Sequence, residues 1–188
     1  LRLRDLVLRD CGIDIDKFET AESLLAEIRA KGIDLDEENI ENLGRGNLID
    51  ALYKKVSRPN IINPTYLIEH PIDLSPLARS NDENPKLTDR FQLVVNGQEI
   101  INGYSELVDC DEQERRFIEQ AELKANGDEE AMSIDTEYIR AMQYGMPPIS
   151  GWGLGIDRFL QFLTNSDNIR DVVLYPLMKP RAAEESEE

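Results

Sequence analysis

The residues whose types and spacing best suit chemistry lie in one segment, 90–107 (RFQLVVNGQEIINGYSEL). Asn96-Gly97 stands there between two apolar runs, which predicts a β-hairpin with a two-residue turn. With that turn Gln92 faces Ile101. Because side chains alternate along a strand, Gln92 and Glu99 share a face as diagonal neighbours about 7–8 Å apart at the backbone. Two oxygen-bearing side chains at that distance are able to share a Mg²⁺ ion, which prefers oxygen ligands.

A second polar set follows in the same segment. Asn102, Tyr104 and Glu106 fall on one face by their spacing of two residues, whereas Glu99 is out of phase with them. A β-bulge near Ile100–Ile101 would bring both sets onto one surface, because a bulge adds one residue to one strand. The surface would then present carboxylate, amide and phenol groups, which suit a cation such as a lysine ammonium. An ordinary solvated sheet face is the other interpretation of this pattern.

A glycine-rich stretch, 150–158 (SGWGLGIDR), is the other candidate site. Its glycines at 151, 153 and 155 allow a ligand to approach the backbone closely, and the following helix offers unpaired N–H groups to an anion. Arg158 falls in the first turn of that helix, where a cation is unfavourable for the helix dipole. A guanidinium there can instead stack on a base or pair with phosphate. The stretch is neither a Walker A loop, which needs GK[ST], nor part of a parallel βαβ unit.

The elements that must hold these residues are both helices and strands. Apolar residues at helical spacing, bounded by capping residues and by Gly or Pro, predict helices, and extended apolar runs predict strands. We expect helices within 1–8, 20–32, 47–56, 111–125 and 135–145 and after Gly155, strands within 61–71, 91–107 and 172–175, and a turn at 150–155. Helices around an antiparallel hairpin indicate an α+β fold.

Composition excludes several classes of protein. Lys+Arg number 21 and Asp+Glu 38, a formal net charge of −17, which is opposite to the basic face of most free-standing nucleic-acid binders. Cys11 and Cys110 have no CxxC spacing, so a zinc ribbon is excluded and two free thiols in a reducing cytosol are expected. His70 is the single histidine, which removes Ser–His–Asp and His-rich metal chemistry unless His70 alone carries it. No apolar run approaches the roughly 20 residues of a membrane span.

Several blocks together resemble class II lysyl-tRNA synthetases, in order and in spacing, over roughly residues 46–180. The blocks are SPLAR (75–79), LTDRFQLVVNGQEIINGYSEL (87–107), DEQERRF (111–117), YGMPP (144–148) and GWGLGIDR (151–158), the last of which is similar to class II motif 3. The resemblance implies a class II antiparallel sheet flanked by helices. It also implies a cytoplasmic lysine–tRNA ligase, which converts lysine and ATP to lysyl-adenylate and then transfers lysine to tRNA(Lys).

The resemblance also assigns roles to individual residues. It implies that Glu99 binds Mg²⁺ and ATP, with Gln92 as the second candidate metal ligand. Arg158 would stack on adenine near the phosphates, with Gly155 also at the nucleotide, and Arg158 and Glu99 would be the catalytic residues. The lysine pocket would be lined by Asn102, Tyr104, Glu106 and the backbone at Gly153, with Glu106 on the side-chain ammonium. Such a reaction relies on positioning and charge neutralisation, so it needs no catalytic histidine.

Two features depart from the family pattern. Gln92 stands where family members usually have a second glutamate, which leaves the number and affinity of metal ions open. No segment matches motif 1, motif 2 or the N-terminal anticodon-binding domain. We therefore expect residues 1–181 to be the C-terminal part of a catalytic domain, residues 182–188 to be a disordered acidic tail, and the full-length protein to be a homodimer. On this view the fragment alone is inactive.

Other functions stay open at this point. A paralogue that lysylates a protein substrate would share the same blocks, but such paralogues tend to replace a motif 3 glycine by alanine, and all three glycines are intact here. Aspartyl and asparaginyl relatives share motif 3, yet they have no cationic ligand that needs a carboxylate such as Glu106. The chain can also be a binding or assembly module with no activity of its own.

Overall fold

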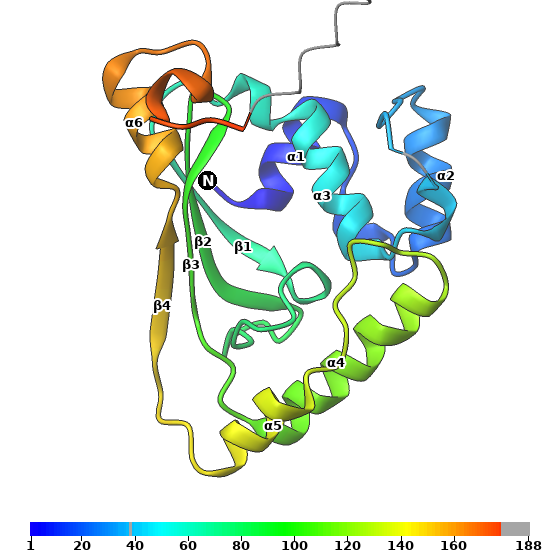
Figure 1. Cartoon of the computed structure of the whole chain (residues 1–188). Coiled ribbons are helices and arrows are strands. Elements are labelled where there is room, and N and C mark those ends of the chain that lie inside the picture. The colour runs from blue at the N-terminus through cyan, green and yellow to red at the C-terminus, as the bar shows by residue number, and fades with distance from the viewer. Residues whose placement is uncertain (38, 178–188) are drawn as a thin grey trace, which may run out of the picture. The chain divides into compact units, whose positions relative to one another are not determined.

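The computed structural model describes residues 1–37 and 39–177, which form an α+β fold (Figure 1). The chain divides into two compact units, Leu1–Leu154 and a second that begins at Gly155. The α+β prediction is therefore confirmed. The acidic tail predicted at 182–188 lies outside the described residues, as does the boundary predicted at residue 181.

One sheet of antiparallel strands forms the frame of the first unit, in the order β1-β2-β3-β4. The strands are β1 (Thr65–Pro71), β2 (Leu87–Val95), β3 (Gln98–Ser105) and β4 (Ser150–Leu154). The turn between β2 and β3 is at Asn96 and Gly97, whose φ angles of 48° and 70° are those of the tight hairpin turn that Asn-Gly favours. The predicted hairpin and its turn are thus confirmed.

β4 is a strand that the sequence analysis missed, because a turn was expected at 150–155. Glycine disfavours strands, since it has no side chain to pack against its neighbours. The stretch nevertheless pairs with β3 from Ser105↔Ser150 to Ile101↔Leu154, and backbone hydrogen bonds, which need no side chain, hold it there. The prediction of a turn is therefore wrong, and the glycines belong to an outer strand of the sheet.

Helices α1 (Leu3–Cys11), α2 (Ala21–Ala30) and α3 (Arg45–Val56) lie together on one side of the sheet (Figure 1). Leu67 of β1 and Val94 of β2 are fully buried in the same apolar cluster as the inward side chains of these helices. Thr20 caps α2 by accepting a hydrogen bond from the backbone N–H of Ser23, and the predicted helix is confirmed. This cluster is the main core of the first unit.

Helices α4 (Cys110–Ala125) and α5 (Thr136–Gln143) follow β3 in the chain and precede β4. The carboxylates of Asp109 and Asp135 cap them by accepting from backbone N–H groups of the first turn. Their apolar faces meet in a second, smaller core of Phe117, Ile139 and Met142. Both helices confirm the predicted positions, and their core lies beyond the Ser105 end of β3.

The second unit contains α6 (Ile156–Thr164) and a short 3-10 helix, η5 (Ile169–Val172). The helix predicted after Gly155 is confirmed. The strand predicted at 172–175 is wrong, because residue 172 ends η5 and residues 173–175 belong to no strand. An apolar run forms a strand only where a neighbour satisfies its backbone groups.

Among residues 1–37 and 39–177, no helix is long and apolar enough to cross a membrane.

Candidate active site

A β-bulge in β3 decides which side chains share a face of the sheet. Val94 pairs with Glu99, and the next residue of β2, Leu93, pairs with Ile101. Ile100 is therefore an extra residue in β3, and it is 4% exposed. A bulge moves all later side chains of its strand to the opposite face. The bulge that the polar pattern predicts at this position is confirmed.

The bulge brings two polar sets onto one surface, which we name the site face. Gln92 pairs with Asn102, so the register that a regular hairpin predicts, with Gln92 opposite Ile101, is wrong. The partners of Glu99 and Asn102 on β2 are two residues apart, so both side chains lie on the same face. The site face of these strands carries Gln92, Glu99, Asn102 and Tyr104, as the sequence analysis expects.

β4 adds backbone to the site face without adding side chains. Gly153 lies opposite Asn102, and Gly151 lies opposite Tyr104. Trp152 between them points to the other face of the sheet, where it is 67% exposed. A Cβ at Gly153 would meet nothing within 4 Å. The space beside Asn102 is therefore open to a ligand, and backbone groups of β4 border it.

Gln92 and Glu99 are in direct contact. Nε2 of Gln92 donates to Oε2 of Glu99 at 2.5 Å, and Gln92 is 5% exposed. The amide nitrogen faces the carboxylate, so the amide oxygen points elsewhere. No group of three or more His, Cys, Asp or Glu in the described part of the chain is placed to hold a metal ion. Glu99 fits a Mg²⁺ ion that takes a single protein carboxylate and completes its shell with phosphate and water oxygens.

Glu106 follows β3 and is half-buried at the other end of the site face. Its backbone N–H donates to the carbonyl of Ile149 at 2.9 Å, and a Cβ at Gly151 would lie 3.1 Å from its Oε1. Burial raises the pKa of Glu106, and within residues 1–37 and 39–177 its carboxylate makes no ion pair. Among the described residues the carboxylate is partly dehydrated and pairs with no cation, which is a costly state for a negative charge.

Two phenols stand beside this carboxylate. Burial and the charge of Glu106 raise the pKa of Tyr104 and of Tyr138, which lies on α5. Tyr138 also packs edge to face on Phe117, with ring centroids 5.9 Å apart. The sequence predicts Tyr138 in a helix but gives no indication that it belongs to the site. Only the packing of α5 brings it there, and no local sequence signal reports that packing.

Arg90 is a second residue of the site face that the sequence analysis did not assign. Its Nε donates to Oδ1 of Asn102 at 3.0 Å, and its Nη1 donates to the carbonyl of Leu74 at 2.9 Å and to Oγ of Ser75 at 3.0 Å. Arg90 pairs with Tyr104 in the register of β2 and β3. It lies inside a block that carries the family resemblance, but that block alone does not indicate its partners.

A further arginine holds the backbone that carries Glu106. Arg116 of α4 is 3% exposed, and it donates to the carbonyl of Ala78 and to Oγ of Ser80, both at 2.8 Å. Ala78 in turn forms an isolated antiparallel bridge with Glu106. Segment 75–80 is thus attached to α4 on one side and to the end of the site face on the other, which restricts the position of Glu106.

The single histidine is a buried neutral group with no access to a ligand. His70 is 1% exposed, and burial lowers its pKa to about 3. Its side chain lies next to Gln92 and is shielded from solvent. Cys11 and Cys110 are free thiols, as their spacing predicts. The chemical groups of the site face are therefore carboxylates, amides, a phenol and the guanidinium of Arg90.

Arg158 and Gly155 belong to the second unit. Gly155 is the N-cap residue of α6, and Arg158 lies in the first turn of that helix, as the sequence predicts. Gly155 has a φ of −74°, which any residue can adopt. The role of both residues in binding a nucleotide stays a prediction.

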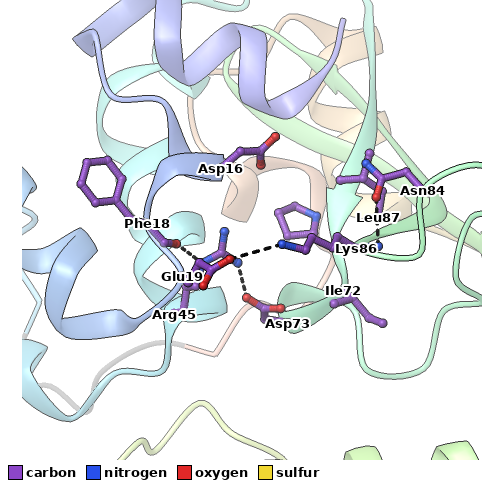
Figure 2. A pocket seen from close by; sticks show the side chains of 10 residues that line it. Asp16, Phe18, Glu19, Arg45, Ile72, Asp73, Asn84, Lys86 and Leu87 are labelled. Atoms are coloured by element: carbon purple, nitrogen blue, oxygen red, sulfur yellow. Dashed lines mark hydrogen bonds and ion pairs between the residues drawn. The ribbon is translucent and has the colours of Figure 1, made fainter.

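A cavity of about 380 Å³ in the first unit has a different lining (Figure 2). Arg45 in its wall donates to the carbonyl of Phe18 at 2.7 Å and pairs with Asp73, and Lys86 pairs with Glu19 at 3.5 Å. These charges are already balanced, and no residue of the site face lines the cavity. The site face is therefore the better candidate for the active site.

The antiparallel sheet and its polar hairpin agree with a known family. A model of the class II tRNA synthetases (D, K and N) matches residues 17–179, which include every strand of the sheet. The chain belongs to this family, and the resemblance of the five sequence blocks is confirmed.

Individual relatives narrow the comparison. The chain is 43% identical over 187 residues to the lysine–tRNA ligase of Thermotoga maritima, which covers 100% of this chain and 36% of that protein. It is 44% identical over 168 residues to the heat-inducible lysine–tRNA ligase of Escherichia coli, which covers 89% and 32%. It is 41% identical over 187 residues to the lysine–tRNA ligase of Thermosipho africanus, which covers 100% and 36%. The chain spans about a third of the length of these curated relatives.

Proposed function

We propose that this chain supplies the lysine-binding face and part of the ATP site of a lysine–tRNA ligase. The observation that carries the proposal is Glu106, a half-buried carboxylate whose pKa is raised by burial and which makes no ion pair within the described residues. A site that keeps such a carboxylate is suited to a cationic ligand, because the ligand provides the missing counter-charge. The lysine–tRNA ligases at 41–44% identity support lysine as that ligand.

Lysine would lie along the site face. Its side-chain ammonium would pair with Glu106, where the phenols of Tyr104 and Tyr138 supply further polar contacts. Its other end would approach Asn102 and the bare backbone of Gly153, which face each other across β3 and β4. The negative charge of Glu106 therefore favours lysine over acidic amino acids, because an aspartate side chain would carry the same charge as Glu106.

ATP would occupy the Glu99 end of the site face. Glu99 would hold Mg²⁺, which neutralises charge on the phosphates when it is bound, and Gln92 would hold the Glu99 carboxylate through its amide. The assignment of Arg158 and Gly155 to nucleotide binding rests on the family resemblance alone. The lysine carboxylate would then attack the α-phosphate in line. The protein groups contribute position and charge, which suffice for this class of transfer.

The extent of the chain limits what it does alone. A complete reaction would take ATP, lysine and tRNA(Lys), and a second copy of a longer protein is the expected partner. We expect little lysine activation by residues 1–188, because the resemblance assigns the arginine on the α-phosphate to motif 2, which no segment here matches. Loss of one contact to transition-state charge commonly costs on the order of 10²–10³ in rate. A binding module without activity is the outcome that this short span of the relatives favours for the isolated chain.

The proposal is tested by exchanging this chain for the matching third of the Thermotoga maritima relative. Lysine-dependent ATP–pyrophosphate exchange is measured on the chimera, on the unmodified relative and on residues 1–188 alone. We expect exchange with lysine by the chimera, none with aspartate or asparagine, and very little by the isolated chain. A folded chimera that activates aspartate or asparagine, or that activates no amino acid, contradicts the proposal.

A further inference from the structure

The proposed reaction leaves one charged group of the site face without a task. Arg90 lies on β2 opposite Tyr104 and is half-buried. Burial lowers the pKa of Arg90, whereas Glu99, Asp50 and Tyr104 act in the opposite direction. A guanidinium keeps its charge under such conditions. A permanent cation is therefore built into a face whose proposed ligand is itself a cation, which indicates that Arg90 acts on the protein and not on the lysine ammonium.

The geometry of Arg90 indicates what it acts on. Its guanidinium links Asn102 of β3 to the segment at residues 74–75. Nε donates to Oδ1 of Asn102, and Nη1 donates to the carbonyl of Leu74 and to Oγ of Ser75. The amide oxygen of Asn102 is therefore occupied. An amide has an acceptor end and a donor end of almost the same shape, so its nitrogen must point away from Arg90. Both N–H groups are then available on the side where Gly153 leaves open space.

We infer that Arg90 is a positioning residue, which fixes the side-chain amide of Asn102 with its N–H groups toward the bound amino acid. This inference rests on the proposed function for the identity of the ligand. The N–H groups of Asn102 need an acceptor, and the carboxylate is the only acceptor group of free lysine. Without Arg90 the amide can turn over and present its oxygen, which would oppose a carboxylate.

The substitution Arg90→Lys separates the effect of side-chain geometry from that of charge. An ammonium keeps the positive charge but has no planar fork, so it cannot hold Asn102 and Ser75 together with the same directions. Arg79 offers a matched control, because it is an exposed arginine of the neighbouring segment that pairs with Asp82 at 2.5 Å and with Asp89 at 3.3 Å. Arg79→Lys makes the same chemical change without a contact to Asn102.

The first measurement follows the Asn102 side-chain amide in ¹⁵N-labelled residues 1–188 by NMR and needs no ligand. The two N–H signals are assigned by their loss in Asn102→Ser. We expect Arg90→Lys to move them toward the positions of free asparagine amides, and Arg79→Lys to leave them in place. Ser75→Ala removes one acceptor of Arg90 and should move them partly, which covers the case that Arg90→Lys does not fold. Unmoved signals in the folded variants overturn the inference.

The second measurement is the binding of two ligands to the same variants. Lysine has a carboxylate, whereas cadaverine has the ammonium and the chain but no carboxylate. We expect Arg90→Lys to weaken lysine binding roughly tenfold and to leave cadaverine binding unchanged. Equal losses for both ligands, or no loss for lysine, overturn the inference. If neither ligand binds to residues 1–188, both ligands are titrated on the chimera with the same substitutions, where equal losses for lysine and cadaverine again overturn the inference.

Discussion

At the scale of single residues, two glutamates on one strand have different surroundings. Glu99 accepts a hydrogen bond from Gln92 at 2.5 Å, so a neutral donor already stabilises its charge. Glu106 has burial as the cause of its raised pKa and makes no ion pair in the described part of the chain. The first carboxylate is held in place before any ligand arrives, and the second gains most from a cation. This difference supports separate roles for the two.

Replacement of Glu106 tests its role in selecting lysine. Glu106→Gln keeps the shape and removes the charge, so we expect lysine binding to lose roughly 2–5 kcal/mol while ATP binding changes little. Affinities for both ligands are measured separately on the chimera. Glu114→Gln, on an exposed position of α4, is the matched control. Unchanged lysine affinity would show that Glu106 is not the specificity carboxylate.

The raised pKa of Glu106 also predicts a pH dependence of lysine binding. Only the ionised carboxylate pairs with an ammonium, so affinity falls as the pH falls through the pKa of Glu106, which lies above its usual 4.5. His70 stays neutral through this range because its pKa is about 3, and Tyr104 and Tyr138 titrate at high pH. Calorimetry from pH 7 downward should show this loss in the parent chimera. The same loss in Glu106→Gln would contradict it.

At the residue scale, part of the site is predictable from sequence. Gln92, Glu99, Asn102 and Tyr104 share a face if β3 has a bulge near Ile100–Ile101, a hypothesis that alternation along the strand and the out-of-phase Glu99 indicate and the register confirms. Arg90 and Tyr138 were not assigned to the site. Arg90 shares a face with Gln92 by the same alternation, so the hairpin pattern did contain a signal for it. Tyr138 comes near Glu106 only through the packing of α5, about which a single sequence contains no information.

At the scale of elements, the start of α3 depends on a residue from another part of the chain. Asp128 is fully buried, and its carboxylate accepts from the backbone N–H of Gly44 at 2.7 Å and from Nδ2 of Asn47 at 2.8 Å and 2.9 Å. The apolar pattern predicts a start at Asn47, whereas the helix begins at Arg45. No local capping side chain marks that start, because the cap is supplied by tertiary structure.

Removal of this cap should destabilise the first unit. Asp128→Ala leaves the N–H of Gly44 and the amide of Asn47 buried without an acceptor, so we expect the free energy of unfolding to fall by about 1–3 kcal/mol. Urea denaturation of residues 1–188 measures it. Glu129→Ala, at the next and exposed position, should change stability by much less. Equal effects of the two substitutions would show that the carboxylate of Asp128 does not support α3.

Two glycines of β4, Gly151 and Gly153, allow a test of where the Glu106 carboxylate lies. A Cβ at Gly151 would lie 3.1 Å from Oε1 of Glu106, whereas a Cβ at Gly153 would meet nothing within 4 Å. We therefore expect Gly151→Ala to displace the Glu106 carboxylate and shift its pKa, and Gly153→Ala to leave that pKa unchanged. NMR titration of the Glu106 carboxyl carbon without ligand measures both. A pKa that is the same in both variants would contradict the placement of Glu106 over Gly151.

At the scale of the whole molecule, charge and length set what the chain is able to do alone. The net charge is −17, and the chain spans about a third of its curated relatives. The α+β class and the confirmed helices were predictable, because periodicity and caps are local features of the sequence. The strand β4 was not, since glycine gives no strand signal and pairing with β3 decides its conformation.

The charge predicts how residues 1–188 behave toward RNA. Phosphate neutralisation by Lys and Arg supplies most of the affinity of proteins for nucleic acids, and a chain of net charge −17 repels the phosphates. We expect no binding of tRNA(Lys) by the isolated chain even at low salt, and binding by the chimera. Electrophoretic mobility shifts measure both. Salt-dependent binding by the isolated chain would contradict this expectation.

The bulge at Ile100 has a consequence for how this site can change over generations. Glu99 and Asn102 are three residues apart, a spacing that shares a face only because Ile100 between them is an extra residue. Deletion of Ile100 would leave Glu99 opposite Val94 and Asn102 opposite Gln92 in a regular hairpin, with both side chains still on one face. A one-codon deletion at Gly103 would instead place Tyr104 on the face opposite to Asn102, so the bulge is the one position of β3 where the strand can lose a residue without dividing the site.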